Sequence, residues 1–259
     1  MWVNIGTVLL SCLNIFSWFL QTAEPGAILV FLTGVEQISR LKRDIRSCYT
    51  LDKINYRLVP LHSHMDSSRQ RRIFETPPNG ARKIILTTNI VETSITIEDV
   101  VFVVDCGRVI MSSRDVETNR QSLSPQWITA ANSMQRKGRA GRVQPGVCYH
   151  LFSKGRARLL EPYQKPEILR TRLEDVILKI KVLQLGKAGE FLNLMMDKPD
   201  GKIVKTSIEL LKRLNALDEG ENLTPLGHQL AKLSVGPQVG KMILLGERLF
   251  IYVFKLCWN

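Results

Sequence analysis

The chain has 259 residues, of which 44% are hydrophobic and 23% charged, so its length predicts one large or two ordinary domains and its composition excludes a disordered protein. Its 36 Lys and Arg residues against 24 Asp and Glu leave a net charge of +12, which favours a polyanionic partner: nucleic acid, or less often an acidic membrane surface. A structural protein with a solvated basic face fits the same numbers.

Residues 1–24 form an apolar N-terminal segment. Residues 2–20 carry no charge and approach the length of a membrane span, but Asn and Ser residues dilute their hydrophobicity. No basic residue precedes them, as a signal peptide would require. Three interpretations remain open: a weak membrane anchor, a buried helix, or a sequence artefact. We favour the last two and expect no stable membrane association, because the residues that follow are typical of a nuclear or cytoplasmic protein.

Strands and helices alternate along residues 25–170. A continuous apolar run at 27–32 is typical of a buried parallel strand, and apolar residues from Val35 to Ile45 then recur at helical spacing. An Arg-rich helix is expected at 66–74. Further strands are expected at 56–61, 83–87, 100–104 and 148–152. This alternation predicts an α/β fold, a parallel sheet with helices on both faces.

Ligands of such sheets bind beyond the carboxyl ends of the strands, so the polar residues at these ends are candidates for chemistry. They are Thr33-Gly34, His62-Ser63-His64, Thr88-Asn89 and Asp105. Because His62 and His64 alternate faces on a strand and have no third ligand nearby, we interpret them as structural and expect no metal site in the chain.

Residues 171–238 predict a second, smaller and mainly helical domain. Helical periodicity runs over 173–183 and 206–214, and a third helix follows Leu223. Residues 239–259 are again apolar and stop abruptly, which we interpret as the truncated start of a further helical domain. Together with the first segment, they suggest that the chain is a piece of a longer protein.

The basic charge is concentrated between Arg108 and Arg172, where 13 Lys or Arg and four Asp or Glu give a net charge of +9. Within this region residues 135–142 read QRKGRAGR. Arg139 and Arg142 lie three positions apart, so on one helix both guanidiniums would project from one face, and a planar guanidinium suits a phosphate. The stretch therefore indicates an arginine-finger element for phosphoryl transfer. A basic surface cluster of the nuclear-localisation kind is the simpler alternative.

This stretch resembles motif VI of superfamily 2 helicases. Residues 88–97, TNIVETSITI, resemble motif V of the DEAH-box branch, and residues 29–34, LVFLTG, resemble motif IV. Downstream stretches such as YQKPEILRT and LTPLG are similar to the winged-helix region of the same enzymes. The resemblance covers about residues 25–245 and is nearest to the RNA helicase A and G-quadruplex-resolving branch of ATP-dependent RNA helicases. It implies a RecA-like sheet domain, the second lobe of such a helicase, followed by a winged-helix domain.

The resemblance implies roles for individual residues. Arg139 and Arg142 match the arginine fingers that reach the γ-phosphate of ATP, and Gln135 matches a residue near that phosphate. For the nucleotide, Phe74 matches an aromatic that stacks on adenine, Glu98 an acidic position at the ribose, and Ser94 a position sensitive to nucleotide state. For the nucleic acid, the matching positions are Thr88, Asn89, Thr33 and Gly34. Residues 108–128 match a β-hairpin that helps to part strands.

The simpler interpretations are that Phe74 belongs to a core, that Glu98 is a surface acid and that Thr88 and Asn89 cap a turn. The sequence also departs from the family pattern in three places: Thr33 and Arg172 replace the usual Pro, and Val91 replaces the usual Ala.

The sequence contains no G-x-x-x-x-G-K-[ST] phosphate-binding loop and no D-E-x-H motif. ATP and Mg²⁺ would therefore be bound mainly by a first RecA-like domain that the chain lacks, and we expect the chain alone to be inactive. Two hypotheses follow: the C-terminal lobe of an ATP-dependent helicase acting on RNA, DNA or G-quadruplexes, or a catalytically inactive nucleic-acid-binding pseudo-helicase fragment. Anchoring by residues 2–20 is a third.

Overall fold

The computed structural model describes residues 12, 14, 15, 25–48, 55–92, 96–114 and 121–257. The chain divides into two compact units. The first comprises residues 1–111 and 124–164, and the second comprises residues 112–123 and 165–259.

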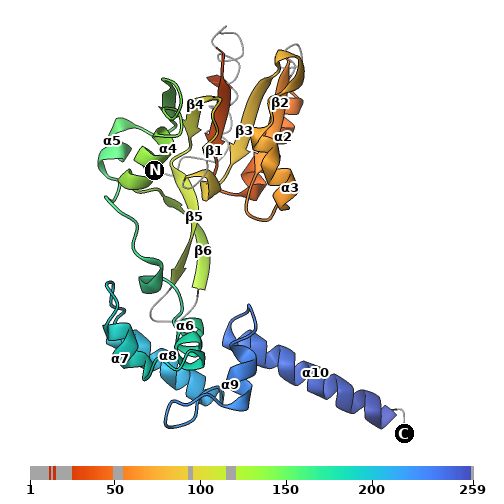
Figure 1. Ribbon diagram of the computed structural model, residues 1–259, viewed down its shortest axis with the longest axis vertical. Helices are drawn as coiled ribbons and strands as arrows, with labels where there is room; N and C mark the ends of the chain where they lie inside the picture. Colours follow the sequence, from red (N-terminus) through yellow and green to blue (C-terminus); the bar gives the residue numbers. More distant parts are fainter. Residues whose placement is uncertain are drawn as a thin grey trace. The chain divides into compact units, whose positions relative to one another are not determined.

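The first unit is built on a sheet of five parallel strands in the order β2-β3-β1-β4-β7. Figure 1 shows β1 at its centre, as expected for a strand whose five residues are all buried. The strands are β1 (Ala27–Phe31), β2 (Tyr56–Leu61), β3 (Arg82–Thr87), β4 (Val100–Asp105) and β7 (Val147–His150). The α/β class and all five strands expected from the sequence are thereby confirmed, although the last ends two residues early.

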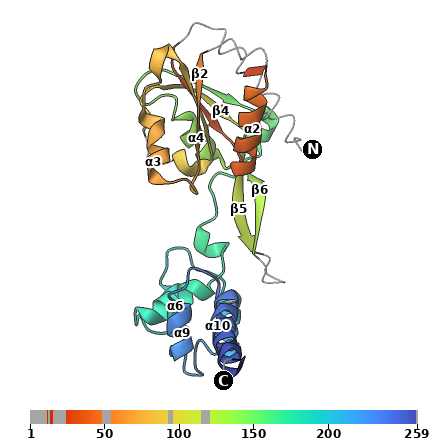
Figure 2. The same ribbon diagram turned by 90° about the vertical axis from the view of Figure 1, so that its right-hand side faces the viewer.

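Helices cover both faces of this sheet (Figure 2). On one face α2 (Val35–Arg46) buries Ile38, Leu41 and Ile45 against apolar side chains of the strands. Burial of each such side chain contributes about 1.5–3 kcal/mol. Cys12 is fully buried in the same cluster. The short elements on and around the sheet are α3 (Ser67–Gln70), η1 (Arg71–Phe74), η2 (Pro78–Gly80), η3 (Asn89–Val91), α4 (Ala130–Lys137) and α5 (Lys154–Arg158).

The helix expected at 66–74 is not continuous. It begins at Ser67 and tightens into the 3₁₀ helix η1 at Arg71. Only Ile73 is buried along these eight residues, so no apolar stripe holds a longer α-helix in place.

A separate two-stranded sheet consists of β5 (Arg108–Arg114) and β6 (Gln121–Trp127). This is the region that the resemblance to helicases matched to a β-hairpin.

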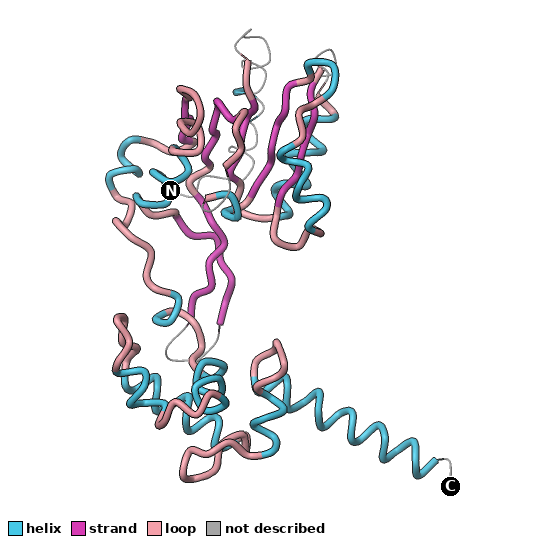
Figure 3. Tube along the Cα trace, viewed as in Figure 1, coloured by secondary structure: helices cyan, strands magenta, loops and turns pink. Residues whose placement is uncertain are grey.

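The second unit, from Lys165 onward, consists of helices joined by loops (Figure 3). Its core gathers apolar residues from α6, α7, α8 and α9 around Leu178 and Leu211, and an isolated antiparallel bridge joins Leu217 to Leu223. The elements are η4 (Glu167–Leu169), α6 (Glu174–Val182), α7 (Ala188–Asn193), α8 (Gly201–Arg213), α9 (Pro225–Leu230) and α10 (Pro237–Cys257).

Residues 2–20 lie outside the described residues except for Cys12, Asn14 and Ile15. Among the helices of the described ranges, none combines the length and the apolar character needed to cross a bilayer.

The close packing of α9 against the preceding turn predicts a glycine requirement. A Cβ on Gly227 would overlap the carbonyl oxygen of Ala216, whereas one on Gly201 meets no atom within 4 Å. We expect Gly227→Ala to destabilise the second unit by about 1–3 kcal/mol, since backbone must move to admit the methyl group. Gly201→Ala, in α8, is the control and should be neutral or stabilising by up to about 1 kcal/mol. Chemical unfolding followed by circular dichroism measures both, and equal effects would contradict the packing argument.

Candidate functional site

The carboxyl ends of neighbouring strands align at one edge of the sheet. Thr87, at the end of β3, pairs in register with Phe31 of β1 and Leu61 of β2, and Phe31 pairs with Asp105 of β4. The backbone N–H of Leu32 donates to the carbonyl of Thr87 at 2.7 Å. The sheet therefore brings Thr33-Gly34 and Thr88-Asn89, the residues matched to nucleic-acid contacts, to adjacent places on this edge.

These four residues differ in accessibility. Thr33 is 7% exposed, and Gly34 is buried so closely that a Cβ would lie 2.7 Å from the Ile110 side chain. Thr88 is half-buried and Asn89 exposed, and the Thr88 side chain makes no capping hydrogen bond to η3. Asn89 is therefore the best placed of the four to contact a ligand through its side chain. Thr33 stands where the family usually has Pro, and it supplies a backbone N–H that Pro lacks. This N–H donates a hydrogen bond to Gln37 Oε1 at 3.0 Å.

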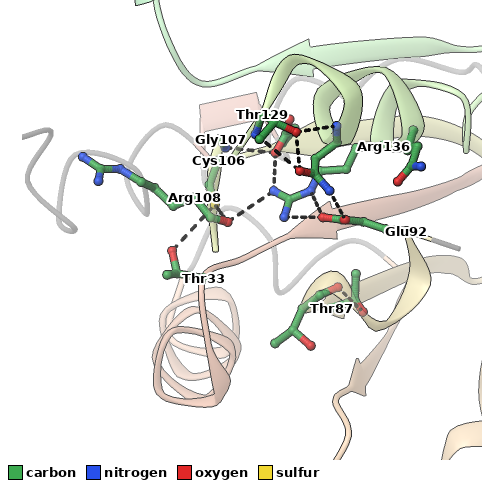
Figure 4. A network of polar contacts seen from close by, with 12 residues as sticks. Thr33, Thr87, Glu92, Cys106, Gly107, Arg108, Thr129 and Arg136 are labelled. Carbon is green, nitrogen blue, oxygen red and sulfur yellow. Dashed lines mark hydrogen bonds and ion pairs between the residues drawn. The ribbon is translucent and has the colours of Figure 1, made fainter. Parts of the chain in front are cut away.

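A fully buried guanidinium lies next to this edge (Figure 4). Arg136, on α4, donates from Nε to Glu92 Oε1 at 2.6 Å and from a terminal nitrogen to Asp105 Oδ1 at 2.7 Å. Glu92 follows η3, and Asp105 is the last residue of β4. Both carboxylates are themselves buried, at 7% and 0% exposure, so Arg136 ties α4 to the segment after η3 and to the end of β4 through buried ion pairs.

The start of α4 reinforces this attachment. Thr129 and Asn132 form a capping box, in which the Thr129 hydroxyl accepts from the backbone N–H of Asn132 at 3.2 Å. The Asn132 amide also donates to Glu92 Oε2 at 2.8 Å. Asn132 and Arg136 are four residues apart and share one face of the helix, so Glu92 fixes both the position and the rotation of α4.

Asp105 has three partners of its own. Besides Arg136, its carboxylate accepts from the N–H of Gly107 at 2.9 Å and lies 3.2 Å from His150 Nδ1. Gly107 has a φ of 71°, in the left-handed region that glycine adopts without strain. Burial alone would raise the pKa of the Asp105 carboxyl, but the hydrogen bond of His150 and the charge of Arg136 hold it below its ordinary value. Asp105 therefore remains ionised in the core.

The candidate arginine fingers follow α4. The sequence expectation that one helix carries both is wrong, because α4 ends at Lys137 and Arg139 and Arg142 lie in the turns after it. Arg139 is 8% exposed and donates to the Gln135 carbonyl at 3.4 Å, whereas Arg142 is exposed and donates to Thr96 Oγ1 at 3.2 Å. Burial and the positive charge of Arg142 lower the pKa of the Arg139 guanidinium. An anion near both cations would relieve their repulsion.

Most residues matched to nucleotide contacts have a chain neighbour in one apolar cluster of the sheet. Ile73, Ile97 and Ala140 are buried in one apolar cluster with Val91. Phe74 directly follows Ile73, Glu98 directly follows Ile97, and the two candidate arginines lie on either side of Ala140. Phe74 is 58% exposed and Glu98 is also exposed. The simpler interpretation, that Phe74 belongs to a core, is therefore wrong, and its ring is available for stacking. Ser94 lies outside the described residues.

Two distinct regions result. The residues matched to nucleic-acid contacts lie at the carboxyl edge. Asp99, next to Glu98, instead lies at the amino edge, because its carbonyl accepts from the N–H of Ala27, the first residue of β1, at 2.7 Å. The expectation that chemistry concentrates at the carboxyl ends therefore covers only part of the site. Among the described residues, no group of three or more His, Cys, Asp or Glu side chains is arranged to hold a metal ion.

The sequence reasoning missed the residues that hold these regions in place. Glu92 lies in the stretch 88–97 and Arg136 in the stretch 135–142, the two most informative motifs. Their opposite charges indicated an ion pair between these motifs. Lys83 is a single charged residue in an otherwise apolar strand interior, and it is 3% exposed. A charge within a run that predicts burial indicates a partner.

The ion pairs of Arg136 predict a pH-dependent loss of stability. Arg136→Met should lower the free energy of unfolding by about 3–5 kcal/mol at pH 7, because two buried carboxylates lose their cation. In the wild type the pKa of Asp105 is depressed, so its contribution is present above the unfolded pKa of about 4 and disappears as the pH falls below it. In the variant burial dominates and raises that pKa, so the deficit should shrink from pH 7 to pH 5. Denaturant unfolding at the two pH values measures this.

The exposed Arg43, on α2, provides the control for the loss of one positive charge. Arg43→Met should change stability little at either pH. A deficit of Arg136→Met that is the same at pH 5 and pH 7 would show that lost packing, not the stranded carboxylates, causes the instability.

Known protein families match two separate parts of the chain. The family described as helicase conserved C-terminal domain matches residues 9–144, and the family described as helicase associated domain (HA2), winged-helix, matches residues 207–235. The chain is 51% identical over 223 residues to the human ATP-dependent DNA/RNA helicase DHX36. The matched residues make up 86% of this chain and 22% of that protein. It is 46% identical over 234 residues to the Arabidopsis thaliana DExH-box ATP-dependent RNA helicase DExH3, with 90% and 20% covered.

The chain thus spans about a fifth of the length of these relatives. Among solved structures, the Escherichia coli DEAH/RHA helicase HrpB is similar with a TM-score of 0.78 at 31% identity, over 93% of this chain and 29% of that one. The parallel sheet is the RecA-like fold of a helicase C-terminal lobe. The chain belongs to the helicase conserved C-terminal domain family, in its DExH-box branch, and carries the winged-helix domain associated with these helicases.

Proposed function

We propose that this chain is the second ATPase lobe of an ATP-dependent DExH-box helicase that acts on RNA or structured nucleic acid. Its relatives are ATP-dependent helicases by name. In this proposal a first RecA-like lobe holds the phosphates of ATP and most of the ligands of Mg²⁺. The present chain supplies Arg139 and Arg142 to the terminal phosphate, with Gln135 beside them.

The observation that carries the proposal is that Ile73, Ile97 and Ala140, the chain neighbours of Phe74, Glu98 and the two arginines, are buried in one apolar cluster. An exposed ring, a carboxylate and paired guanidiniums match the base, the ribose hydroxyls and the phosphates of a nucleotide, respectively. Ser94, as a position sensitive to nucleotide state, belongs to the same proposal.

At the carboxyl edge we propose that Thr88, Asn89, Thr33 and Gly34 contact the backbone of the nucleic acid. The exposed amide of Asn89 is an uncharged donor, which suits phosphate and sugar oxygens. Binding of nucleic acid at this edge and of ATP at the other region would be coupled through α4, because its Arg136 contacts Asp105 at this edge and the two arginines follow it.

The arginine assignment predicts a loss of catalysis. The chain alone should hydrolyse no ATP, and adding the ATP-binding lobe of a close relative should restore activity. In that mixture Arg142→Ala or Arg139→Ala should lower kcat by roughly 10³-fold, since an arginine finger stabilises charge in the transition state. Arg158→Ala removes an exposed cation from α5 and should leave kcat unchanged. Wild-type turnover in the Arg139→Ala/Arg142→Ala protein would refute the assignment.

A pseudo-helicase fragment would instead bind nucleic acid without ever gaining ATPase activity from an added lobe. The same mixture therefore separates the two hypotheses.

The nucleic-acid assignment predicts an uncharged contribution at Asn89. Asn89→Ala should weaken binding of single-stranded RNA by about 1 kcal/mol, roughly fivefold, because one hydrogen bond is lost. The slope of log K against log salt should stay the same, since no phosphate loses a cationic partner. Fluorescence anisotropy at several salt concentrations measures both quantities. Asn193→Ala, exposed on α7, is the control, and an equal loss there would contradict a specific contact at Asn89.

A further inference from the structure

Lys83 is a buried ammonium group that links two backbone carbonyls and one side-chain carboxylate. It is the second residue of β3 and is 3% exposed. Its Nζ donates to the carbonyl of Ile73 at 2.7 Å and to the carbonyl of Glu75 at 3.1 Å, and it lies 2.8 Å from Asp99 Oδ2. An ammonium has three N–H donors, so these three acceptors use its full capacity. The ammonium group therefore holds both carbonyls and the carboxylate in place.

Two of these acceptors flank Phe74. The carbonyls of Ile73 and Glu75 lie at the end of η1, where a helix leaves carbonyls without internal partners. Ile73 is 1% exposed in the apolar cluster, and the Glu75 carboxylate pairs with Arg57 at 2.5 Å. The backbone on both sides of Phe74 is thereby held, while the ring itself remains 58% exposed.

The third acceptor lies beside Glu98. Ile97 is 5% exposed in the same cluster, and Asp99 is held through its carbonyl by Ala27 and through its carboxylate by Lys83. Glu98 is exposed between these two anchored residues. Phe74 and Glu98 are thus presented in the same way, each between neighbours that are fixed, and one Lys83 Nζ joins the two segments.

We infer that Lys83 is a positioning residue that sets Phe74 and Glu98 at the separation required by the base and ribose of one nucleoside. The inference rests on the proposed function, in which these two side chains contact ATP. Lys83 touches neither the nucleotide nor the phosphate-directed arginines, so its effect falls on recognition of the nucleoside and not on the phosphoryl-transfer step. A lysine that merely satisfied buried carbonyls would affect all substrates alike.

The test compares ATP with ribose 5-triphosphate, which has no base, in the chain combined with an ATP-binding lobe. Lys83→Met should raise the KM for ATP about tenfold, the scale of one lost base–aromatic stack, and raise the KM for ribose 5-triphosphate by a smaller factor, because that compound keeps only the ribose contact of Glu98. At saturating ATP, kcat should stay within about twofold of the wild type, because the arginines are untouched. Phe74→Ala should raise the KM for ATP alone, and the double variant should be less impaired than the product of the two single effects, since both changes weaken the contact of Phe74 with the base.

Three further measurements make the outcome decisive. Asp99→Asn, at a residue whose side chain is 43% exposed, keeps the two carbonyl bonds of Lys83 and should produce a smaller rise in the KM for ATP. Lys154→Met, at an exposed lysine of α5, should change nothing. In the chain alone, hydrogen exchange at residues 73–76 and 97–100 should be faster in Lys83→Met than in the wild type, in a variant that remains folded by circular dichroism.

The inference is overturned if Lys83→Met changes the KM of ATP and of ribose 5-triphosphate by the same factor, or if exchange at both segments is unchanged. Wild-type turnover of the Arg139→Ala/Arg142→Ala protein would instead refute the proposed function. In that case the exchange experiment still decides whether Lys83 orders the two segments.

Discussion

Most of the first unit depends on one buried guanidinium. Removing the charge of Arg136 from water costs several kcal/mol, and the cost is recovered only because Glu92 and Asp105 meet it with hydrogen bonds and opposite charge. The three residues come from α4, from the segment after η3 and from the end of β4. Their pairing is satisfied in only one arrangement of these segments, which makes it a constraint on geometry more than a source of stability.

The consequence of this constraint is carried along α4. The helix is anchored at its start by Thr129 and Asn132 and in its last turn by Arg136, and it ends one residue later. The chain that leaves this fixed end carries Arg139 and Arg142. Because these turns follow a fixed helix, the long side chains of Arg139 and Arg142 can adjust to a ligand while their backbone keeps its position relative to the sheet. Lys83 performs the corresponding task on the other side of the same apolar cluster, where it fixes the backbone around Phe74 and Glu98.

The sequence predicts the sheet well because a strand buried on both faces leaves a short continuous apolar run between turn residues, a pattern that few other elements produce. The strand expected at 56–61 has the observed bounds, whereas the helix expected at 66–74 divides at Arg71 and the helix expected to carry Arg139 ends at Lys137. Helix ends depend on tertiary partners such as Lys83 and Glu92, and no local pattern encodes a partner 10 or 44 residues away. The candidate residues came from motif resemblance, but their separation into two regions is a property of the folded sheet alone.

The net charge of +9 between Arg108 and Arg172 illustrates the same limit. Arg136 is neutralised by two carboxylates, and the guanidiniums of Arg108 and Arg156 lie 3.8 Å and 4.8 Å from the centre of the Trp127 ring. Burial and the charge of Arg156 also lower the pKa of Arg108. Several of these cations therefore have internal partners, and others are directed at a nucleotide in the proposed function. The number of phosphates that this region can neutralise on a nucleic acid must be smaller than its 13 Lys and Arg residues, and the salt dependence of binding reports that smaller number.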